Sequence, residues 1–182
     1  MKYFKKMESE HLYLSPMVVE DAPLYCKWLN DAKVTDGIGK TKDITTLENE
    51  IEYLQNVTKS GEYNFSIVKK ENDELIGSCS IMKYNHVDQT AEVGLLIGEE
   101  KERGKGYGAE VLRMLLDYGF NVLNLHSIWL GVYAFNEQAI ACYKKVGFKE
   151  AGRLRQAKFY NGKRYDDITM DILKEEYLKN NK

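Results

Sequence analysis

"EKERGKGYGAEVLRMLLDYGF", Glu100 to Phe120, lies a little past the middle of the chain. Three glycines at alternate positions, Gly104, Gly106 and Gly108, lead directly into a helical pattern of apolar residues. Glycine lets a backbone come close to a ligand, and the start of a helix offers unpaired N–H groups with a partial positive charge. The stretch therefore predicts a loop that binds phosphate at the beginning of a helix.

Three other glycine-rich phosphate loops fit this stretch poorly. A dinucleotide-binding loop has the spacing Gly-x-Gly-x-x-Gly, whereas the spacing here is Gly-x-Gly-x-Gly in the middle of the chain. A Walker loop needs Gly-Lys followed by Ser or Thr, but Lys105 is followed by Gly106. A kinase-type loop joins two strands, and this one opens a helix. A plain tight turn is the remaining alternative, although it needs fewer glycines.

Apolar patterns on both sides of the loop predict a βαβ unit. The run TAEVGLLIG at residues 90–98 predicts a strand, and its VGLLI centre is apolar on both faces, as in a buried strand. After the loop, apolar residues recur at helical spacing: Val111, Leu112, Leu115, Leu116, Phe120 and Leu123. The run SIWLGVY at residues 127–133 predicts a second strand. We expect the two strands to be parallel, with a right-handed crossover.

A strand, a helix and a loop are predicted near the beginning of the chain. Residues 11–16 (HLYLSP) alternate in hydropathy and stop at a proline, which is typical of a strand. Residues 18–31 predict a helix, because Leu24 and Trp28 lie four positions apart on one face. The polar residues 34–43 (VTDGIGKTKD) that follow predict a flexible loop.

A second helix and a hairpin come next. Thr45 and Glu48 have the spacing of a capping box, which predicts that a helix over residues 45–57 starts here. Its apolar stripe is Leu47, Ile51 and Leu54. Residues 63–70 and 74–84 predict two strands joined as a hairpin.

The last third of the chain predicts a short helix and a closing hairpin. Residues 136–148 form the helical pattern, with Asn136 at the N-cap and Gly147 just past the end. In residues 155–173, the pair Asn161-Gly162 lies between two arms of strand character. Asn-Gly is the strongest short signal for a hairpin turn.

The composition is that of a soluble globular protein with one domain. The chain has 182 residues, of which 43% are hydrophobic and 30% charged, and its formal net charge of -2 argues against a nucleic-acid partner. No apolar run is long enough to cross a membrane, and no secretory signal is recognisable at the start. The cysteines are few and scattered, which predicts buried free thiols in the cytoplasm: Cys26, Cys79 and Cys142. The histidines show no ligand spacing, so no metal is expected: His11, His86 and His126.

The loop also matches a family pattern, Arg/Gln-x-x-Gly-x-Gly/Ala, over Arg103 to Gly108 (RGKGYG). At this point the chain resembles the GNAT superfamily of N-acetyltransferases, in which the loop binds the pyrophosphate of acetyl-coenzyme A. The resemblance extends from about Thr90 to Leu173. Over these residues the chain is similar to the branch of ribosomal-protein N-terminal acetyltransferases and spermidine acetyltransferases. Before Thr90, only the order of elements and the run VVEDAPLYCKWLND correspond.

This resemblance implies a fold and an activity. The fold is the α/β (α+β) GNAT fold, a mixed, mostly antiparallel sheet flanked by helices with a central acetyl-CoA-binding βαβ unit. Residues 1–182 form one N-acetyltransferase domain, which transfers the acetyl group of acetyl-CoA to a primary amine, either a small molecule or a protein N-terminus. The amine attacks the thioester directly in a ternary complex. Proteins of this kind commonly pair with two-fold symmetry, so a homodimer is expected as well.

The family pattern implies which residues hold acetyl-CoA. The pyrophosphate binds at Arg103, Gly104, Lys105, Gly106, Tyr107 and Gly108. The side chains of Arg103 and Lys105 add cationic donors, although a solvated surface position is an equal alternative for Lys105. In the family two parallel strands separate, here residues 93–97 and 127–133. The backbone of Leu95, Leu96 and Ile97 then binds the pantetheine arm, and one N–H stabilises the oxyanion of the thioester.

Three further residues take roles by resemblance. Asn136 caps its helix and contacts the pantetheine. Tyr143 lies two turns further on and donates a proton to the departing thiolate. The residues alone favour a packing tyrosine at this position, and the family match favours the acid. Glu92 is the candidate base, directly or through water, and a cross-strand surface charge is an equal alternative.

The acceptor is not decided by the sequence. A polyamine such as spermidine or spermine is the alternative substrate, and it suits Asp31, Asp36 and the glutamates of the helix predicted over residues 45–57. Three basic residues suit an acidic or nucleotide-sugar acceptor instead: Arg155, Lys163 and Arg164. Charged loop residues are usually only solvated, so neither set discriminates. A different class of function is a non-catalytic sensor of acyl-CoA, which the presence of Tyr143 beside the complete loop disfavours.

Overall fold

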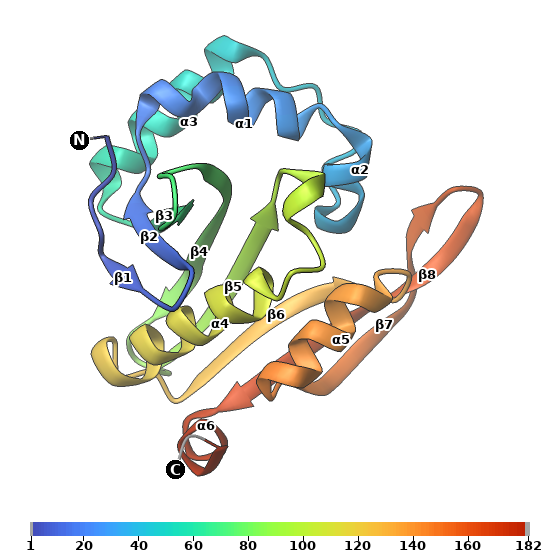
Figure 1. Ribbon diagram of the computed structural model, residues 1–182. Coiled ribbons are helices and arrows are strands. Elements are labelled where there is room, and N and C mark those ends of the chain that lie inside the picture. The colour runs from blue at the N-terminus through green and yellow to red at the C-terminus, as the bar shows by residue number, and fades with distance from the viewer. Residues whose placement is uncertain (1, 181–182) are drawn as a thin grey trace. The chain divides into compact units, whose positions relative to one another are not determined.

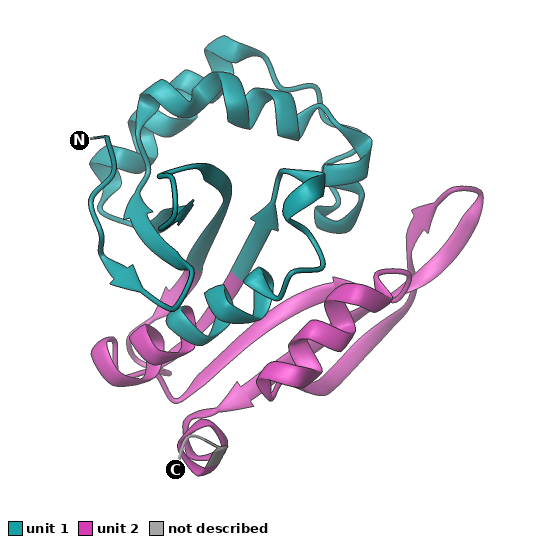
Figure 2. Cartoon of the chain, in the orientation of Figure 1, with its two compact units in different colours: residues 1–81, 94–114 teal, residues 82–93, 115–182 magenta. Residues whose placement is uncertain are grey.

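The computed structural model describes residues 2–180 of the chain. These residues form two compact units (Figure 2). Unit 1 consists of Met1–Ile81 and Gly94–Met114, and unit 2 consists of Met82–Val93 and Leu115–Lys182. Three elements belong partly to each unit: strand β4 (Leu75–Asn85), strand β5 (Thr90–Ile97) and helix α4 (Tyr107–Asp117) (Figure 1).

Unit 1 combines antiparallel strands with helices. Besides its parts of β4, β5 and α4, it contains β1 (Met7–Glu8), β2 (Leu12–Pro16), η1 (Val19–Asp21), α1 (Ala22–Leu29), α2 (Ala32–Thr35), η2 (Asp36–Ile38), α3 (Leu47–Ser60), β3 (Tyr63–Lys69) and η3 (Glu100–Glu102). Its strands have the order β1–β2–β3–β4–β5, and the pairs β1–β2, β2–β3 and β3–β4 are antiparallel. The predicted strand at residues 11–16 and the predicted hairpin are confirmed.

Helices α1 and α3 form the core of unit 1 with its strands. Trp28 and Leu54 are completely buried and pack with Tyr13 and Val68 of the strands. This burial explains why α1 forms, because the face predicted from Leu24 and Trp28 is the one that packs on the sheet. The first turn of the predicted helix is the separate 3₁₀ turn η1.

The predicted capping box of the second helix was wrong by one residue. Thr46, not Thr45, caps α3, and its hydroxyl accepts a hydrogen bond of 3.2 Å from the Asn49 backbone N–H. Thr45 is held elsewhere, because its backbone exchanges two hydrogen bonds with the Asn30 side chain. Leu47 consequently lies outside the core and is 44% exposed.

The predicted loop at residues 34–43 is also partly wrong, because its first residues are helical. Helix α2 and the 3₁₀ turn η2 extend to Ile38. Val34 and Thr35 are buried, and the Thr35 hydroxyl donates to the Asp31 carbonyl at 3.0 Å. Hydrophobic burial and this local bond fix a segment whose composition alone indicates a flexible loop.

Unit 2 contains the parallel strand pair and the closing hairpin. Besides its parts of the shared elements, it contains the π-helical turn η4 (Tyr118–Val122), β6 (Ser127–Tyr133), α5 (Glu137–Val146), β7 (Lys149–Tyr160), β8 (Lys163–Leu173) and α6 (Lys174–Asn180). Strand β5 runs parallel to β6 from Thr90↔Ser127 to Glu92↔Trp129, and the remaining pairs in the order β5–β6–β8–β7 are antiparallel. The parallel pair is confirmed, and so is the predicted class of a mixed, mostly antiparallel sheet with helices.

The turn at Asn161-Gly162 is as predicted. Tyr160 pairs with Lys163 across it, and the φ angles of Asn161 and Gly162 are 46° and 76°. Two consecutive positive φ angles define the type I′ turn that Asn-Gly favours. The pattern did not predict that β7 already begins at Lys149, nor the helix α6.

The helical stripe after the glycine loop is confirmed except at its end. Five of its members are buried: Val111, Leu112, Leu115, Leu116 and Phe120. Leu123 is only half-buried, because the wider π-helical turn shifts the register and Leu125 takes the buried position.

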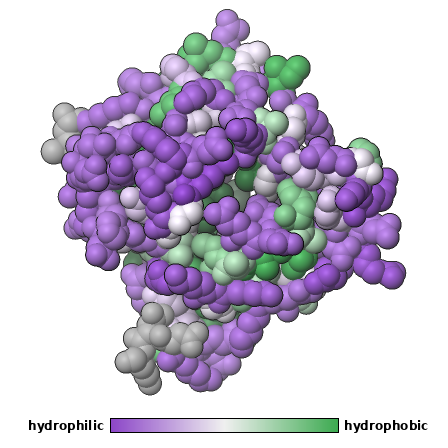
Figure 3. All heavy atoms as spheres, turned by 45° about the vertical axis from the view of Figure 1, so that its right-hand side comes forward, coloured by the Kyte–Doolittle hydropathy of each residue, from purple (hydrophilic) through white to green (hydrophobic). Residues whose placement is uncertain are grey.

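Hydrophilic side chains cover most of the face in Figure 3, with smaller hydrophobic areas between them. Within the described residues, no helix is both long and apolar enough to span a membrane. All three cysteines are free thiols, but only Cys79 is buried, whereas Cys26 and Cys142 are half-buried. The prediction of buried free thiols is correct in full for one cysteine only.

Candidate active site

The glycine loop of unit 1 joins η3 to helix α4. Gly104 and Gly106 have φ angles of 76° and 91°, in the left-handed region that favours glycine. The Gly106 carbonyl accepts hydrogen bonds of 3.1 Å from Ala109 N–H and Glu110 N–H, which begins the helix. A Cβ atom at Gly106 would meet no heavy atom within 4 Å. The loop therefore offers backbone N–H groups and open space at the positive end of a helix dipole, which together suit an anion.

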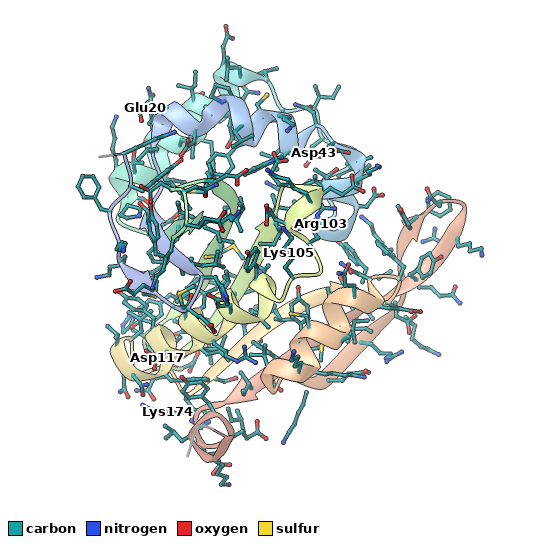
Figure 4. All side chains as sticks on the ribbon, in the orientation of Figure 1. Glu20, Asp43, Arg103, Lys105, Asp117 and Lys174 are labelled. Atoms are coloured by element: carbon teal, nitrogen blue, oxygen red, sulfur yellow. The ribbon has the colours of Figure 1, made fainter. Side chains whose placement is uncertain are left out.

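Arg103 anchors this loop through its guanidinium group (Figure 4). Its Nε donates to the Ile97 carbonyl at 3.0 Å, its Nη2 to the Gly98 carbonyl at 3.3 Å, and its Nη1 to the Lys33 carbonyl at 2.9 Å. All three nitrogens thus bind backbone of unit 1. The guanidinium holds the end of β5, the loop and helix α2 together.

Lys105 is ion-paired within unit 1. Its Nζ lies 2.9 Å from Oε2 of Glu102, a carboxylate that is only 3% exposed. The other oxygen of Glu102 lies 3.6 Å from Nζ of Lys69, which is nearly buried too. Two cations thus balance one buried carboxylate, as a buried charge requires. Lys105 is therefore not an isolated surface charge, because its ammonium group already binds the Glu102 carboxylate.

Glu99 and Trp28 support the loop through a contact that no sequence pattern indicated. The Trp28 indole Nε1 donates to Glu99 Oε1 at 2.9 Å, and Lys27 Nζ reaches the same oxygen at 3.0 Å. These two hydrogen bonds lower the pKa of the Glu99 carboxyl, so it stays ionised. Gly98 is required here, because a Cβ would lie 2.1 Å from the Trp28 ring. No spacing rule links residues this far apart.

The end of β5 is less buried than predicted. Leu95, Leu96 and Ile97 are all half-buried, so the expectation of a strand covered on both faces was wrong for them. Their neighbour Val93 is buried. The backbone of β5 lies against β4, because a Cβ at Gly77 would come 2.0 Å from the Leu96 carbonyl oxygen.

Helix α5 in unit 2 carries two of the predicted site residues. Asn136 is the N-cap, as predicted, and its Oδ1 accepts from Ala139 N–H at 3.2 Å. Tyr143 is half-buried, with its ring centroid 6.2 Å from that of Phe148. Burial, helped by the neighbouring Cys142, raises the pKa of Tyr143 to about 12. The phenol is therefore neutral at physiological pH and able to donate a hydrogen bond.

Glu92 has a partner within unit 2. Its Oε2 lies 2.7 Å from Nζ of Lys83, whose ammonium group also lies 4.8 Å from the centre of the Trp129 ring. The cross-strand charge that the sequence left as an alternative is thus present. Asp167 of β8 is a second half-buried carboxylate in this unit, and burial raises its pKa. The sequence analysis missed it, although its place in a strand arm next to the Asn-Gly turn was visible.

The two units hold different parts of the predicted set. Unit 1 contains the residues expected to bind coenzyme: Leu95, Leu96, Ile97, Arg103, Gly104, Lys105, Gly106, Tyr107 and Gly108. Unit 2 contains the residues expected to act through their side chains: Glu92, Asn136 and Tyr143.

The charged residues considered for the acceptor mostly have structural partners. Asp31 caps α2 by accepting from Lys33 N–H at 2.9 Å, and Asp36 accepts from the Thr41 hydroxyl at 2.6 Å. Arg164 donates to the Gln156 carbonyl at 3.3 Å. These contacts favour neither a polyamine nor an acidic acceptor. Within the described range, no group of three or more His, Cys, Asp or Glu residues is placed to hold a metal ion.

Comparison with known proteins gives the family. The model of the acetyltransferase (GNAT) domain matches residues 11–149. The uncharacterized N-acetyltransferase p20 of Bacillus licheniformis is 33% identical, over 93% of this chain and 96% of the relative. Spermidine N(1)-acetyltransferase of Vibrio cholerae is 34% identical over 69% of this chain and 72% of its own. The chain belongs to the GNAT acetyltransferase family and is an N-acetyltransferase, as predicted.

Solved structures agree. The crystal structure of the Vibrio cholerae spermidine N-acetyltransferase in complex with CoA and spermine has a TM-score of 0.82 and 27% identity, and the match covers 92% of this chain and 98% of that one. A dodecameric structure of the same enzyme has a TM-score of 0.75. The predicted GNAT fold is confirmed.

Proposed function

We propose that this N-acetyltransferase uses acetyl-CoA as its co-substrate and acetylates a primary amine, either a small molecule or a peptide N-terminus. The observation that carries the proposal is the loop at Gly106, where a left-handed backbone and open space precede helix α4. The relative whose crystal structure contains CoA supports it. We also propose that residues 1–182 form one N-acetyltransferase domain.

The coenzyme is bound mainly by backbone. The N–H groups from Gly104 to Gly108 take the diphosphate, for which they need no side chain. Arg103 acts chiefly by holding the loop, since its three nitrogens bind carbonyl groups. Lys105 can turn from Glu102 to the diphosphate, because its side chain is half exposed. The backbone of Leu95, Leu96 and Ile97, which are half-buried residues, takes the pantetheine arm, and one N–H stabilises the thioester oxyanion.

The transfer then needs one proton donor and one acceptor. The amine nitrogen attacks the thioester carbon, and the C–S bond breaks with its electron pair on sulfur. Tyr143 donates to this thiolate, and Asn136 orients the pantetheine. Because the pKa of Tyr143 is raised to about 12, it stays neutral, and a strong hydrogen bond stabilises the leaving thiolate before a proton reaches it. Glu92 takes the proton from the amine, directly or through water, once an acceptor displaces Lys83.

An acceptor screen tests the proposal. Acetyl-CoA is mixed with a panel of amines and peptides, and the release of free thiol is measured. We expect turnover with at least one amine. Tight coenzyme binding without turnover on any amine would instead favour an acyl-CoA sensor.

A polyamine is the second candidate acceptor. Several relatives are named spermidine N(1)-acetyltransferases, among them one from Escherichia coli that is 38% identical over 60% of this chain. Spermidine and spermine therefore belong in the screen. We also propose a cytoplasmic homodimer without metal or nucleic acid, and light scattering at micromolar concentration tests the oligomeric state.

A further inference from the structure

Four aromatic rings of unit 2 contact one another: Tyr133 at the end of β6, Phe135 shortly after it, Tyr160 of β7 and Tyr165 of β8. The ring of Phe135 stacks on Tyr160 with a centroid distance of 4.3 Å and on Tyr133 at 5.6 Å, and it meets the edge of Tyr165 at 5.2 Å. All four side chains are half-buried. They therefore form a partly exposed aromatic cluster.

A cation already lies on this cluster. Nζ of Lys158 is 4.6 Å from the centre of the Tyr133 ring, a distance at which a ring attracts an ammonium ion. Lys158 follows an irregular part of β7, because the register with β8 shifts between Leu154 and Lys158 and Gln156 has a φ of 54°. Strand β7 is also the last strand in the order β5–β6–β8–β7. The lysine that occupies the ring thus comes from an irregular edge strand.

A carboxylate completes the arrangement. Asp167 of β8 is paired with Tyr133 of β6, and its Oδ1 lies 3.9 Å from the place of a Cβ on Gly131. Gly131 is exposed and has no side chain, so the space beside the carboxylate is open. The charge of Lys158 acts on Asp167 through space. Among the described residues, however, the Asp167 side chain has no direct hydrogen bond or ion pair.

A second lysine lies over the same face of β6, and a direct ion pair holds it in place. Alternate residues of a strand share a face, so Trp129, Gly131 and Tyr133 point to the same side of β6. Lys83 lies over Trp129, but a direct ion pair of 2.7 Å fixes it to Glu92. Lys158 lacks such a bond to Asp167. Its ammonium group is the more easily exchanged of the two.

We infer that Tyr133, Phe135 and Asp167 form a binding site for an alkylammonium group, which Lys158 occupies until the acceptor displaces it. This inference rests on the proposed function and specifies its acceptor. An ammonium ion must keep its charge to bind a ring face, whereas the nitrogen that is acetylated must lose its proton. The acceptor thus carries a second amine on an aliphatic stem. A linear diamine and the side chain of a peptide lysine share this chemistry.

Calorimetric titration in the absence of acetyl-CoA tests the site independently of catalysis. The probes are 1,5-diaminopentane, a short lysine peptide and, as a neutral control, 1-pentanol. Lys158→Met keeps an unbranched side chain but removes the competing ammonium group. We therefore expect at least one of the two cationic probes to bind roughly 3–10-fold more tightly. The matched control Lys149→Met should leave the affinity within about 2-fold of wild type, because this ammonium lies at the start of β7 and pairs with Glu176.

Double variants locate the site. Asp167→Asn and Tyr133→Leu, each combined with Lys158→Met, should remove the gain. A gain with the diamine alone identifies a free diamine as acceptor, and a gain with the peptide alone identifies a lysine side chain. Unchanged affinity for both in folded Lys158→Met, or an equal gain for 1-pentanol, would overturn the inference. If binding tightens but no thiol is released from acetyl-CoA, the site stands and the proposed function fails.

Discussion

Helices α4 and α5 begin in opposite ways. Helix α5 starts at Asn136, whose side chain accepts a hydrogen bond from Ala139 N–H. The N-terminus of this helix is therefore capped by a side chain of the protein. Helix α4 follows Gly106, which has no side chain to cap it and a left-handed φ of 91°. The first start is closed by a side chain, and the second leaves backbone N–H groups for an outside anion.

This difference predicts which kinds of substitution should affect coenzyme binding and catalysis at each helix. Along α4 the chemistry belongs to the backbone, so substitutions matter by adding atoms or by loosening the anchors of the loop. Along α5 it belongs to side chains, so deleting single atoms should matter. If substitutions that delete single side-chain atoms affected α4 more than α5, this contrast would be wrong.

The largest effect is expected at Tyr143. Tyr143→Phe keeps the ring and its packing on Phe148 and removes the hydroxyl that is proposed to donate to the thiolate. We expect kcat to fall roughly 10²–10⁴-fold with little change in acetyl-CoA affinity, the scale for a lost general acid. Steady-state rates at saturating acceptor measure it, with Tyr53→Phe on α3 as control. A kcat within a few-fold of wild type would assign Tyr143 to packing.

The pH profile follows from the same group. An acid with a pKa of about 12 remains protonated up to nearly that pH, and its activity is lost only above it. We therefore expect no alkaline decline of kcat/KM from Tyr143 below about pH 11. A decline with a midpoint near pH 9 that disappears in Tyr143→Phe would show that the phenol is far more acidic.

Arg103 should matter first for stability. Arg103→Met removes three charge-assisted hydrogen bonds to carbonyls of Ile97, Gly98 and Lys33. We expect a loss of about 1.5–3 kcal/mol in the free energy of unfolding, since partial exposure limits the sum. Urea denaturation measures it. The control Lys101→Met, which removes an exposed ion pair to Glu74, should cost less than about 1 kcal/mol.

Two variants of Asn136 distinguish its role as a helix cap from a role in coenzyme binding. Asn136→Ala should lower the free energy of unfolding by about 1 kcal/mol, whereas Asn136→Ser keeps a capping oxygen and most of the stability. Loss of coenzyme affinity in the Ser variant at normal stability would identify a pantetheine contact. Unchanged affinity in both variants would leave Asn136 as a cap alone.

The smallest effect is expected at Lys105. Because its ammonium is shared with Glu102, Lys105→Met should weaken acetyl-CoA binding only about 2–5-fold and reduce the salt dependence of binding. Titrations at two ionic strengths measure both. A 100-fold loss would mean that the side chain, not the backbone, carries the diphosphate contact.

Much of the fold followed from local patterns. The Asn136 cap, the Asn161-Gly162 turn and the parallel strands around the glycine loop are signals of a few neighbouring residues, and all three are present. The errors have tertiary causes. Asn30 holds the backbone of Thr45, so the cap of α3 moved to Thr46, and burial of Val34 ordered a segment of polar composition.

The site was predictable in position but not in its contacts. Glycine spacing located the loop, yet it could not show that Arg103 binds carbonyls or that Trp28 and Glu99 support the loop from distant parts of the sequence. The same holds for Lys158 on the ring of Tyr133, because cation–ring contacts leave no periodic pattern. Such contacts depend on which strands become neighbours.

The central claim is that the backbone at Gly106 binds acetyl-CoA. Calorimetric titration of acetyl-CoA into wild type, Gly106→Val and Gly61→Val tests it most directly. Gly61 is the matched control, because it also has a left-handed φ, 69°, and a Cβ there meets nothing within 4 Å. Both variants place a β-branched residue at a positive φ angle, where it is strained. We expect Gly106→Val to lose on the order of 10²-fold in affinity, as for two lost hydrogen bonds to a charged group, and Gly61→Val to bind normally. Folded Gly106→Val with wild-type affinity would contradict the account.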